Sequence, residues 1–264
     1  MIGYCPLGSG SKGNSVFIRS QQTKLLVDAG LSARSLEERL STLGTSLAEI
    51  DAVLITHEHG DHIRGLKQLS LQFHIPILAN GSTAQAIATQ LPFCPKFKIF
   101  TTGDSFTFRD ITIRPFTVQH DTLDPVAFTL SFDNFKLGIC TDLGHATHLV
   151  TDQLQGCNFL YVEANHEPSM VHASPRPLFL KQRILSRHGH LSNADCAELL
   201  CNIAHDGLKH VYLAHLSGEC NSPEKALEVI LERTRKKNFS LSVAVAPQEK
   251  AALPISFSSS STST

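Results

Sequence analysis

The sequence lacks a surplus of charge, a long apolar run and an N-terminal targeting signal. Its 23 Lys and Arg residues are balanced by 24 Asp and Glu, which leaves a net charge of −1. Such a balance excludes a protein that coats nucleic acid or membranes non-specifically, although it is compatible with a local basic patch. No apolar run reaches the length of about 20 residues that spans a bilayer. The N-terminus, MIGYCPLGSGSKGNS, has no basic region followed by an apolar one. We therefore expect a cytoplasmic protein without a membrane partner.

The cysteines also lack the pattern of a disulfide framework or a C-x-x-C site. They number seven, which is odd, and no two of them form a C-x-x-C pair. Several fall within expected strands and helices, namely Cys140, Cys157, Cys196 and Cys201. This pattern is typical of reduced cysteines in the core of a cytosolic protein.

Strand and helix patterns alternate along almost the whole chain. Amphipathic stretches predict helices that begin near Ser35, after His62, and at the capping residues Ser82, Ser192 and Ser222, the last followed by a proline at the first helical position. Apolar, β-branched runs predict strands over residues 16–20, 24–30, 51–56, 75–80, 112–119, 126–132, 135–142, 159–164, 210–215 and 241–247.

The order of these elements favours two packed sheets with helices outside, an α+β fold. The stretch 99–140 has hairpin spacing, with a turn at Asp133-Asn134, whereas both halves of the chain show alternating strands and helices. The length of 264 residues suits one large domain or two small ones. We predict a single domain over 1–257 and a disordered Ser/Thr tail over 258–264.

Histidine is abundant, with 14 residues, and four ligand-type side chains gather in one short segment. The expected strand 51–56 ends in His57-Glu58-His59-Gly60-Asp61-His62, and a helix follows. Positions i and i+2 of an extended segment point the same way, so His57 and His59 can bind one ion together. Asp61 and His62, at the turn into the helix, can reach a second ion nearby. A chance histidine-rich surface turn is the weaker explanation.

Four residues cannot complete two metal sites, because each ion needs about four to six ligands. Three further candidates stand at the ends of apolar strands. His120 follows 116–119, Asp142 follows 138–141, and His215 follows 211–214. Loops at strand ends can bring such residues to a shared edge, so together they supply what the first segment lacks.

With these residues the sequence resembles the metallo-β-lactamase superfamily, and within it the WalJ (YycJ)-type group. The motifs that carry the resemblance lie between about Leu7 and Glu224: LGSGSKGNS, LLVDAGLS, THEHGDHIRGL, CTDLG, VEANH, RHGHLSN and LAHLSGECNSPE. The resemblance implies a four-layer αββα sandwich and a metal site similar to those of ribonuclease Z and ribonuclease J. It also implies 5′→3′ exonuclease action on double-stranded DNA and a role in DNA repair. Asp121-Thr-Leu-Asp-Pro follows the third histidine, where we expect small residues for this group.

The resemblance also implies a ligand set and two divalent ions, zinc or manganese. His57, His59 and His120 would bind one ion, Asp61, His62 and His215 the other, and Asp142 would bridge them. Asp61 would also orient the hydroxide shared by the ions. Glu58 is expected to face away from the metals.

Three further residues are expected to support the site. His190 resembles the catalytic histidine of nucleases in this superfamily; a surface-loop histidine is the alternative. Glu163 would orient His190, with a buried structural role as the equal alternative. Asp28, at the end of the strand 24–30, would support the metal loop.

Two segments could contact phosphate. The glycines of Gly8–Ser15 could bring backbone N–H groups to a phosphate, although a flexible turn explains them as well. The stretch Val171–His190 contains no acidic residue and leads into His190. Four basic residues there, Arg176, Lys181, Arg183 and Arg187, predict a helix that contacts a nucleic-acid backbone, unless they form an ordinary solvated face.

The leading hypothesis is therefore a dinuclear phosphodiester hydrolase that acts on DNA as an exonuclease. The alternatives are a small-molecule or cyclic phosphodiesterase, lactamase- or glyoxalase-like chemistry, and a non-catalytic protein stabilised by metal. The basic stretch and the His190 motif favour phosphodiesters. Native metal, strand polarity and oligomeric state stay open at this stage.

Overall fold

Two seven-stranded sheets form the centre of the computed structural model, which describes residues 2–237 and 239–257. The first has the order β14-β1-β2-β3-β4-β5-β6 and the second β13-β12-β11-β10-β9-β8-β7. The first sheet comprises β1 Gly3–Gly8, β2 Ser15–Arg19, β3 Lys24–Val27, β4 Ala52–Leu54, β5 Ile77–Asn80, β6 Phe97–Phe100 and β14 Ile255–Ser256. The second comprises β7 Phe106–Phe108, β8 Ile111–Thr117, β9 Val126–Phe132, β10 Phe135–Cys140, β11 Phe159–Glu163, β12 His210–Ala214 and β13 Val243–Val245.

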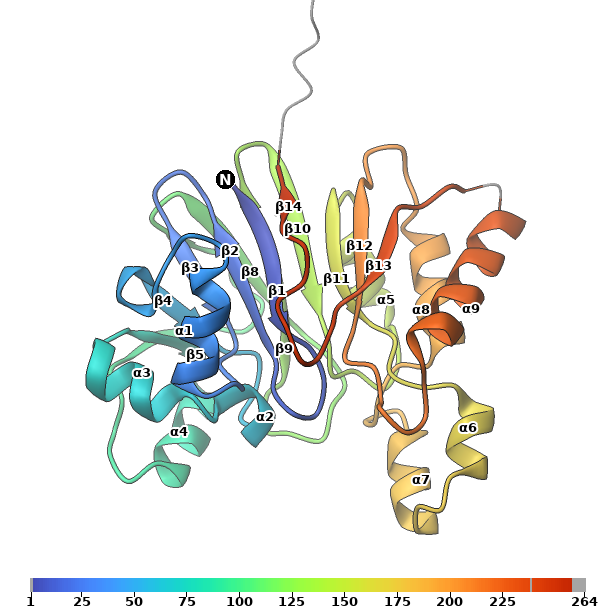
Figure 1. Cartoon of the computed structure of the whole chain (residues 1–264), viewed down its shortest axis with the longest axis horizontal. Helices are drawn as coiled ribbons and strands as arrows, with labels where there is room; N and C mark the ends of the chain where they lie inside the picture. The colour runs from blue at the N-terminus through green and yellow to red at the C-terminus, as the bar shows by residue number, and fades with distance from the viewer. Residues whose placement is uncertain (1, 238, 258–264) are drawn as a thin grey trace, which may run out of the picture.

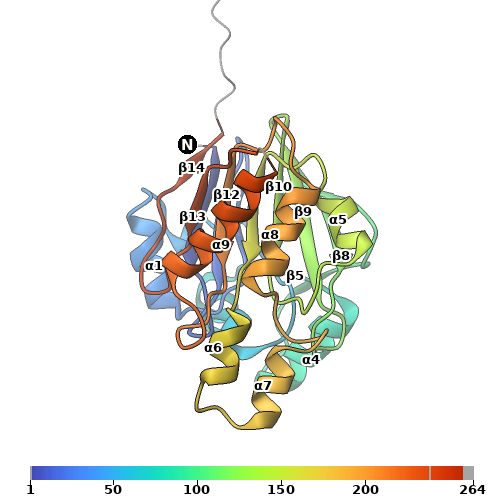
Figure 2. The ribbon, with the colours of Figure 1, turned by 90° about the vertical axis from the view of Figure 1, so that its right-hand side faces the viewer.

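Helices cover the outer face of each sheet, so the chain forms four layers (Figures 1 and 2). One apolar core, which includes Tyr4 and Phe128, lies between the sheets. A second core packs under α1, α3 and α4, and a third under α5, α8 and α9. The expected αββα sandwich is therefore confirmed. The helices are α1 Ala33–Ser41, α2 Gly60–Ile63, α3 Leu66–Phe73, α4 Gly81–Gln90, α5 His148–Leu154, α6 Pro168–Ala173, α7 Leu178–Ile184, α8 Asn193–Asn202 and α9 Pro223–Lys236, with a 3₁₀ turn at Leu47–Glu49.

The strand directions bring several strand ends to one edge of the sandwich. Strands β3 to β6 are parallel, and so are β10 to β13. Strand β8 pairs antiparallel with β9, which pairs antiparallel with β10, so β8 runs in the same direction as β10. The carboxyl ends of β3, β4, β8, β10, β11 and β12 consequently meet at the same end of the molecule. Every predicted ligand follows one of these ends.

Most element boundaries follow the sequence pattern, with local corrections. Ser192 caps α8, and Ser222 caps α9 with Pro223 in its first turn, as predicted. Helix α1 begins earlier than expected, capped by Ser32, and α4 is capped by Asn80 rather than Ser82. Strand β1 was missed, because its glycines and proline weaken a strand pattern. The expected tail 258–264 lies outside the described residues.

The cysteines are free, and five of them are buried, in line with reduced core thiols. Cys201 is a partial exception, since it lies at the core margin, and Cys94 is exposed. Among the residues that the structure describes, every helix is too short or too polar to cross a membrane.

Candidate metal centre

Three polar residues at the end of the sandwich adopt a left-handed backbone conformation. Asp28, Asp142 and His215 follow β3, β10 and β12, and their φ angles are 61°, 58° and 54°. A non-glycine residue in this backbone conformation is destabilised by on the order of 1–3 kcal/mol. The conformation persists where the surrounding structure fixes it. The turn at each strand end thus directs these side chains towards one another.

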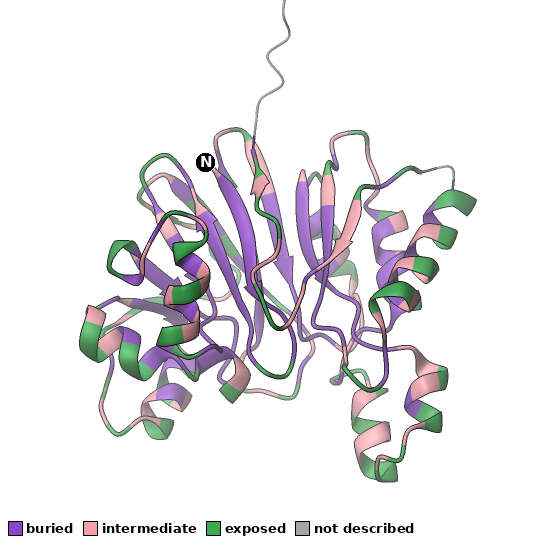
Figure 3. Ribbon diagram, viewed as in Figure 1, coloured by how far each residue is buried: buried purple, intermediate pink, exposed green. Residues whose placement is uncertain are grey.

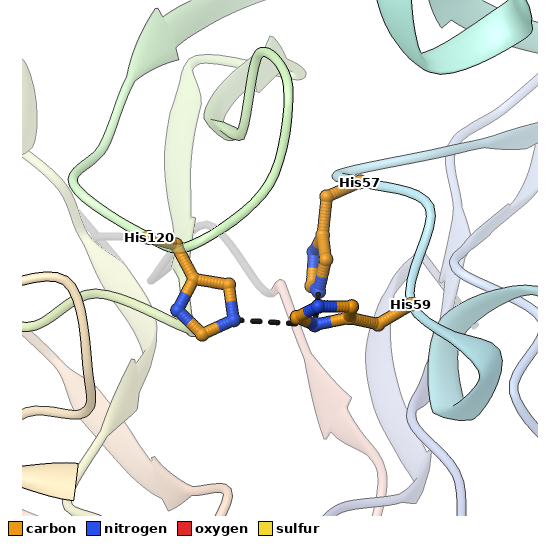
Figure 4. A group of neighbouring side chains, drawn as sticks. All are labelled: His57, His59 and His120. Carbon is orange, nitrogen blue, oxygen red and sulfur yellow. Dashed lines mark hydrogen bonds between the residues drawn. The ribbon is translucent and has the colours of Figure 1, made fainter. Parts of the chain in front are cut away.

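His57, His59 and His120 form one group of converging imidazoles (Figure 4). His57 Nε2 lies 3.1 Å from His59 Nδ1, which lies 3.3 Å from His120 Nε2. The first two rings come from the loop after β4, and the third comes from the loop after β8. Three nitrogen atoms at this spacing can bind a single ion.

Asp61, His62 and His215 form a second group beside the first. Asp61 Oδ2 lies 3.6 Å from His62 Nε2 and 3.7 Å from His215 Nε2. Asp142 stands between the groups, with Oδ2 3.3 Å from His62 Nε2 and Oδ1 3.9 Å from His120 Nε2. The structure therefore brings all seven predicted ligands together, in the two groups and with the intermediate carboxylate that the sequence predicts.

The donor set fits divalent metal ions. Asp142 Oδ2 and His215 Nε2 are buried and have no hydrogen-bond partner among the described residues. A buried polar atom without a partner is costly, and cations held by these groups would remove that cost. Imidazole and carboxylate donors suit ions such as zinc or manganese.

Each buried imidazole of the two groups is oriented by a hydrogen bond at Nδ1, the nitrogen that does not point into the group, as is usual for metal-binding histidine. Asp28 Oδ2 lies 2.8 Å from His62 Nδ1, and Asp28 also accepts hydrogen bonds from the backbone N–H and the hydroxyl of Thr56. Asp28 thus occupies the supporting position expected of it. The Nδ1 atoms of His57, His120 and His215 face Thr56 Oγ1, Gly189 O and Glu163 Oε1 at 2.9, 3.1 and 3.0 Å. Nε2 of each ring points into the groups of ligands, where His62 Nε2 also lies 3.0 Å from Asn14 Nδ2.

The buried side chains of the centre have shifted pKa values, which affect how they bind an ion. Burial lowers the pKa of His57, assisted by the nearby His62. Burial also opposes charge on His62, but the carboxylates of Asp28 and Asp142 outweigh it and raise the pKa of His62 to about 10. Burial alone would raise the pKa of Asp142, whereas His215 and His62 hold it well below its ordinary value. Metal binding should therefore depend on pH, since His62, whose pKa is raised, must give up a proton before it can bind an ion.

His190 lies at the open side of these groups. Its Nδ1 is 2.7 Å from Glu163 Oε1 and 3.8 Å from Asp142 Oδ1, and its side chain is 23% exposed. Glu163 is fully buried and also accepts a hydrogen bond from the backbone N–H of Leu143. Burial would raise the pKa of Glu163, but His190 and His215 lower it. One ionised carboxylate therefore orients both a predicted ligand and His190.

Asn14, in the glycine-rich loop, is a residue of the centre that sequence reasoning missed. Its Oδ1 accepts a hydrogen bond from the Gly10 N–H at 2.7 Å, which fixes the amide orientation. Its Nδ2 consequently faces Asp61 Oδ2 at 3.1 Å and His62 Nε2 at 3.0 Å. The N–H groups of Gly13 and Asn14 bond to Gly10 O and Asp61 O. These amides bind the protein itself, which favours support of the metal loop over a phosphate cradle.

Glu58 points away from the two groups, as expected. Its Oε1 accepts a hydrogen bond from the Leu123 N–H at 3.0 Å. This bond attaches the loop after β8 to the segment that carries His57 and His59.

The basic stretch forms two short helices, α6 and α7, that project beyond the strand ends (Figure 1). Two of its cations are paired with acids from elsewhere: Arg183 with Asp121 at 2.6 Å and Arg176 with Glu219 at 2.9 Å. Lys181 donates to a backbone carbonyl, and Arg187 is exposed. The local positive charge is thus smaller than the sequence suggests. Asp121 opens the segment in which we expected small residues, and its Oδ1 lies 3.5 Å from His120 Nε2.

Comparisons with known proteins define the class. A model of the beta-lactamase superfamily domain matches residues 23–216, which include every predicted ligand. The chain belongs to the metallo-β-lactamase superfamily. It is 36% identical over 244 residues to exodeoxyribonuclease YycJ of Bacillus anthracis, covering 91% of this chain and 92% of that protein. It is 34% identical to exodeoxyribonuclease WalJ of Streptococcus pneumoniae, covering 91% of each.

A solved structure supports the fold independently. The metallo-β-lactamase fold protein YhfI from Bacillus subtilis matches with a TM-score of 0.71 at 17% identity, covering 94% of this chain and 97% of that chain. The resemblance inferred from the motifs is therefore confirmed. So is the expectation of a metal-dependent hydrolase, which excludes a non-catalytic binding protein.

Proposed function

We propose that this hydrolase is a DNA exonuclease that works with two divalent ions, zinc or manganese, and degrades double-stranded DNA in the 5′→3′ direction. The observation that carries the proposal is the pair of ligand groups that share Asp142, with His190 beside them. The exodeoxyribonuclease relatives, similar along nine-tenths of the chain, support DNA as the substrate. A role in DNA repair follows from the same resemblance.

His57, His59 and His120 would hold one ion, Asp61, His62 and His215 the other, and Asp142 would contact both. When bound, such ions polarise a phosphoryl oxygen and lower the pKa of water, so that a nucleophile is available near neutral pH. Asp61 would orient that nucleophile, because its Oδ2 faces the interior of the second group.

His190 would supply the proton that the departing sugar oxygen needs. Its Nδ1 faces an ionised Glu163 and must donate to it, which leaves Nε2 as the atom that carries a proton to the substrate. General acid catalysis of this kind contributes about 10²–10⁴-fold in rate. Arg176, Lys181, Arg183 and Arg187 would bind phosphates of the same strand.

A small-molecule phosphodiesterase is the second candidate. The pairing of Arg183 with Asp121 and of Arg176 with Glu219 favours it, because paired cations attract a polyanion less strongly. Lactamase- or thioester-hydrolysing chemistry has no comparable support, since it needs neither the basic stretch nor a proton donor at His190.

Hydrolysis of end-labelled duplex DNA and of bis-p-nitrophenyl phosphate, with manganese and zinc separately, tests these alternatives. We expect early release of a 5′-terminal label as mononucleotide, and progressive shortening of the strand when the label is at the 3′ end. Release of the 3′ label first would reverse the polarity. Turnover of the small diester without any DNA cleavage would refute the nuclease and favour the second candidate. A His59→Ala preparation controls for contaminating nucleases.

A further inference from the structure

Helix α7 is rich in apolar side chains but buries none of them. Four of its seven residues, LFLKQRI, are apolar, yet no residue of the helix is buried. Leu178 and Phe179 are 69% and 66% exposed. Figure 3 shows the contrast with the other helices, whose inner faces are buried. Apolar side chains that stay exposed gain no folding stability from burial, so an exposed apolar helix indicates a binding surface.

Exposed apolar side chains gather at this end of the molecule. Eight large hydrophobic residues are exposed among those described, and four of them lie on α7, just after it, or on the loop after β8. We call these four the apolar rim: Leu123, Leu178, Phe179 and Leu185.

The rim flanks the metal centre from two sides. Leu123 is attached to the His57–His59 segment through Glu58. Helix α7 is attached to the loop that carries His190, because the His190 N–H donates to Ile184 O at 3.1 Å. Helix α7 also lines a cavity of about 150 Å³ with Leu180, Arg183 and Ile184, and the other side of this cavity includes His120, Asp121 and His190. Helix α7 therefore reaches the site of chemistry with Leu180 and Ile184, and the same helix carries Leu178 and Phe179 of the rim.

The charges beside the rim indicate what it binds. Of the four cations in residues 171–190, Arg176 and Arg183 are paired with acids from elsewhere, whereas Lys181 and Arg187 form no ion pair among the described residues. Cations next to exposed apolar and aromatic side chains are the combination that binds a single nucleic-acid strand, with phosphates on the cations and bases stacked on the rings. Inside a duplex the base faces are covered by their neighbours, so an apolar rim can contact only bases that are unpaired or at an end.

We propose that the apolar rim binds unpaired bases at the end of the DNA strand being degraded, so that the enzyme acts on frayed or single-stranded termini. The inference rests on the proposed exonuclease function and narrows its substrate. Phe179 is the principal base contact, and Leu178 extends the same surface. Lys181 and the exposed Arg187, which carry no ion pair among the described residues, bind the phosphates that follow.

The experiment compares two 5′-labelled duplexes that differ only in their ends, one fully paired and one with three mismatched terminal pairs. The wild-type enzyme should cleave the frayed end with the higher kcat/KM. Phe179→Ala should raise KM on that end by about 5- to 150-fold, the range expected for loss of one stacked base. Phe179→Trp should restore KM, because it retains an aromatic face. Hydrolysis of bis-p-nitrophenyl phosphate and metal content should stay as in the wild type.

The matched control is Leu71→Ala, which truncates an exposed apolar residue on α3, in the opposite layer of helices. It should leave KM on both ends unchanged. A direct readout of binding is the fluorescence of 2-aminopurine placed at the frayed terminus of a phosphorothioate-blocked strand. The wild-type protein should quench it through stacking, and Phe179→Ala should not.

Equal cleavage of both ends, together with an unchanged KM in Phe179→Ala, would overturn the inference. The proposed exonuclease function would still hold. A wild-type enzyme that cleaves the small diester but no DNA would instead refute the proposed function, and the inference with it. A wild-type dimer that Phe179→Ala dissociates, or binding to lipid vesicles that this variant abolishes, would also overturn the inference, because the rim would then serve another partner.

Discussion

The Nδ1 atom of His190 lies 2.7 Å from Oε1 of Glu163, a carboxylate that the fold buries completely. The same oxygen lies 3.0 Å from Nδ1 of His215, which belongs to the second ligand group. Glu163 thus links a residue proposed to donate a proton with one proposed to bind metal. The ring of His190 is accordingly fixed relative to the centre although it is partly exposed.

His190→Ala should cut turnover on DNA by about 10²–10⁴-fold and retain about two bound ions, because the seven proposed ligands would hold both ions without it. Bis-p-nitrophenyl phosphate should suffer much less, since p-nitrophenolate leaves without protonation. Metal analysis and kinetics on both substrates check this. Loss of metal would make His190 a ligand, and full DNA turnover would make it a loop residue.

His59→Ala should lose at least one ion and nearly all activity, because it removes one of the three nitrogens of the first group. Glu58→Gln is the matched control: the adjacent side chain points to Leu123, and its amide oxygen can still accept that hydrogen bond. The control should keep its metal. The test is to measure the metal content of both variants in freshly purified protein. Full activity of His59→Ala would refute the ligand assignment.

Asn14→Ala should weaken binding of one ion by about 10–100-fold, as expected when a partner of a metal ligand is lost. The physical reason is that Asn14 Nδ2 holds Asp61 Oδ2 beside His62. Competition with a graded series of chelators gives the affinity of each ion, and Ser11→Ala, in the exposed part of the same loop, serves as control. Unchanged affinity for both ions would limit Asn14 to a role in loop folding.

Arg183→Ala combined with Arg187→Ala should weaken DNA binding and reduce the steepness of its salt dependence by about one to two in log–log slope, because each lost phosphate contact contributes about 0.9. Turnover of the small diester should change little. Arg235→Ala, an exposed cation on the distant helix α9, controls for net charge. Equal losses on both substrates would favour the small-molecule phosphodiesterase.

Arg187→Ala alone should weaken DNA binding and reduce its salt dependence more than Arg183→Ala alone. Arg183 is already paired with Asp121, so less of its charge is available to a phosphate. The salt dependence of each single variant, measured by fluorescence anisotropy, tests this order.

The sequence by itself determined the class of the protein and the identity of the grouped side chains. The segment from His57 to His62 is local, and its spacing after a strand sets which side chains can point together. His120, Asp142 and His215 could be found because each ends an apolar strand, and strands that run in one direction deliver their ends to one edge.

Only the tertiary structure decided the contacts between segments that carry no shared pattern. Asn14 reaches Asp61 across 47 residues, and Arg183 reaches Asp121 across 62. Neither pair has a spacing that a helix or strand would impose. The basic stretch looked like a solvated or DNA-binding helix, but the fold left the apolar side of α7 uncovered and neutralised part of its charge. Burial and pairing depend on which surfaces the two sheets bring together, and a periodic pattern along one segment contains no information about its neighbours.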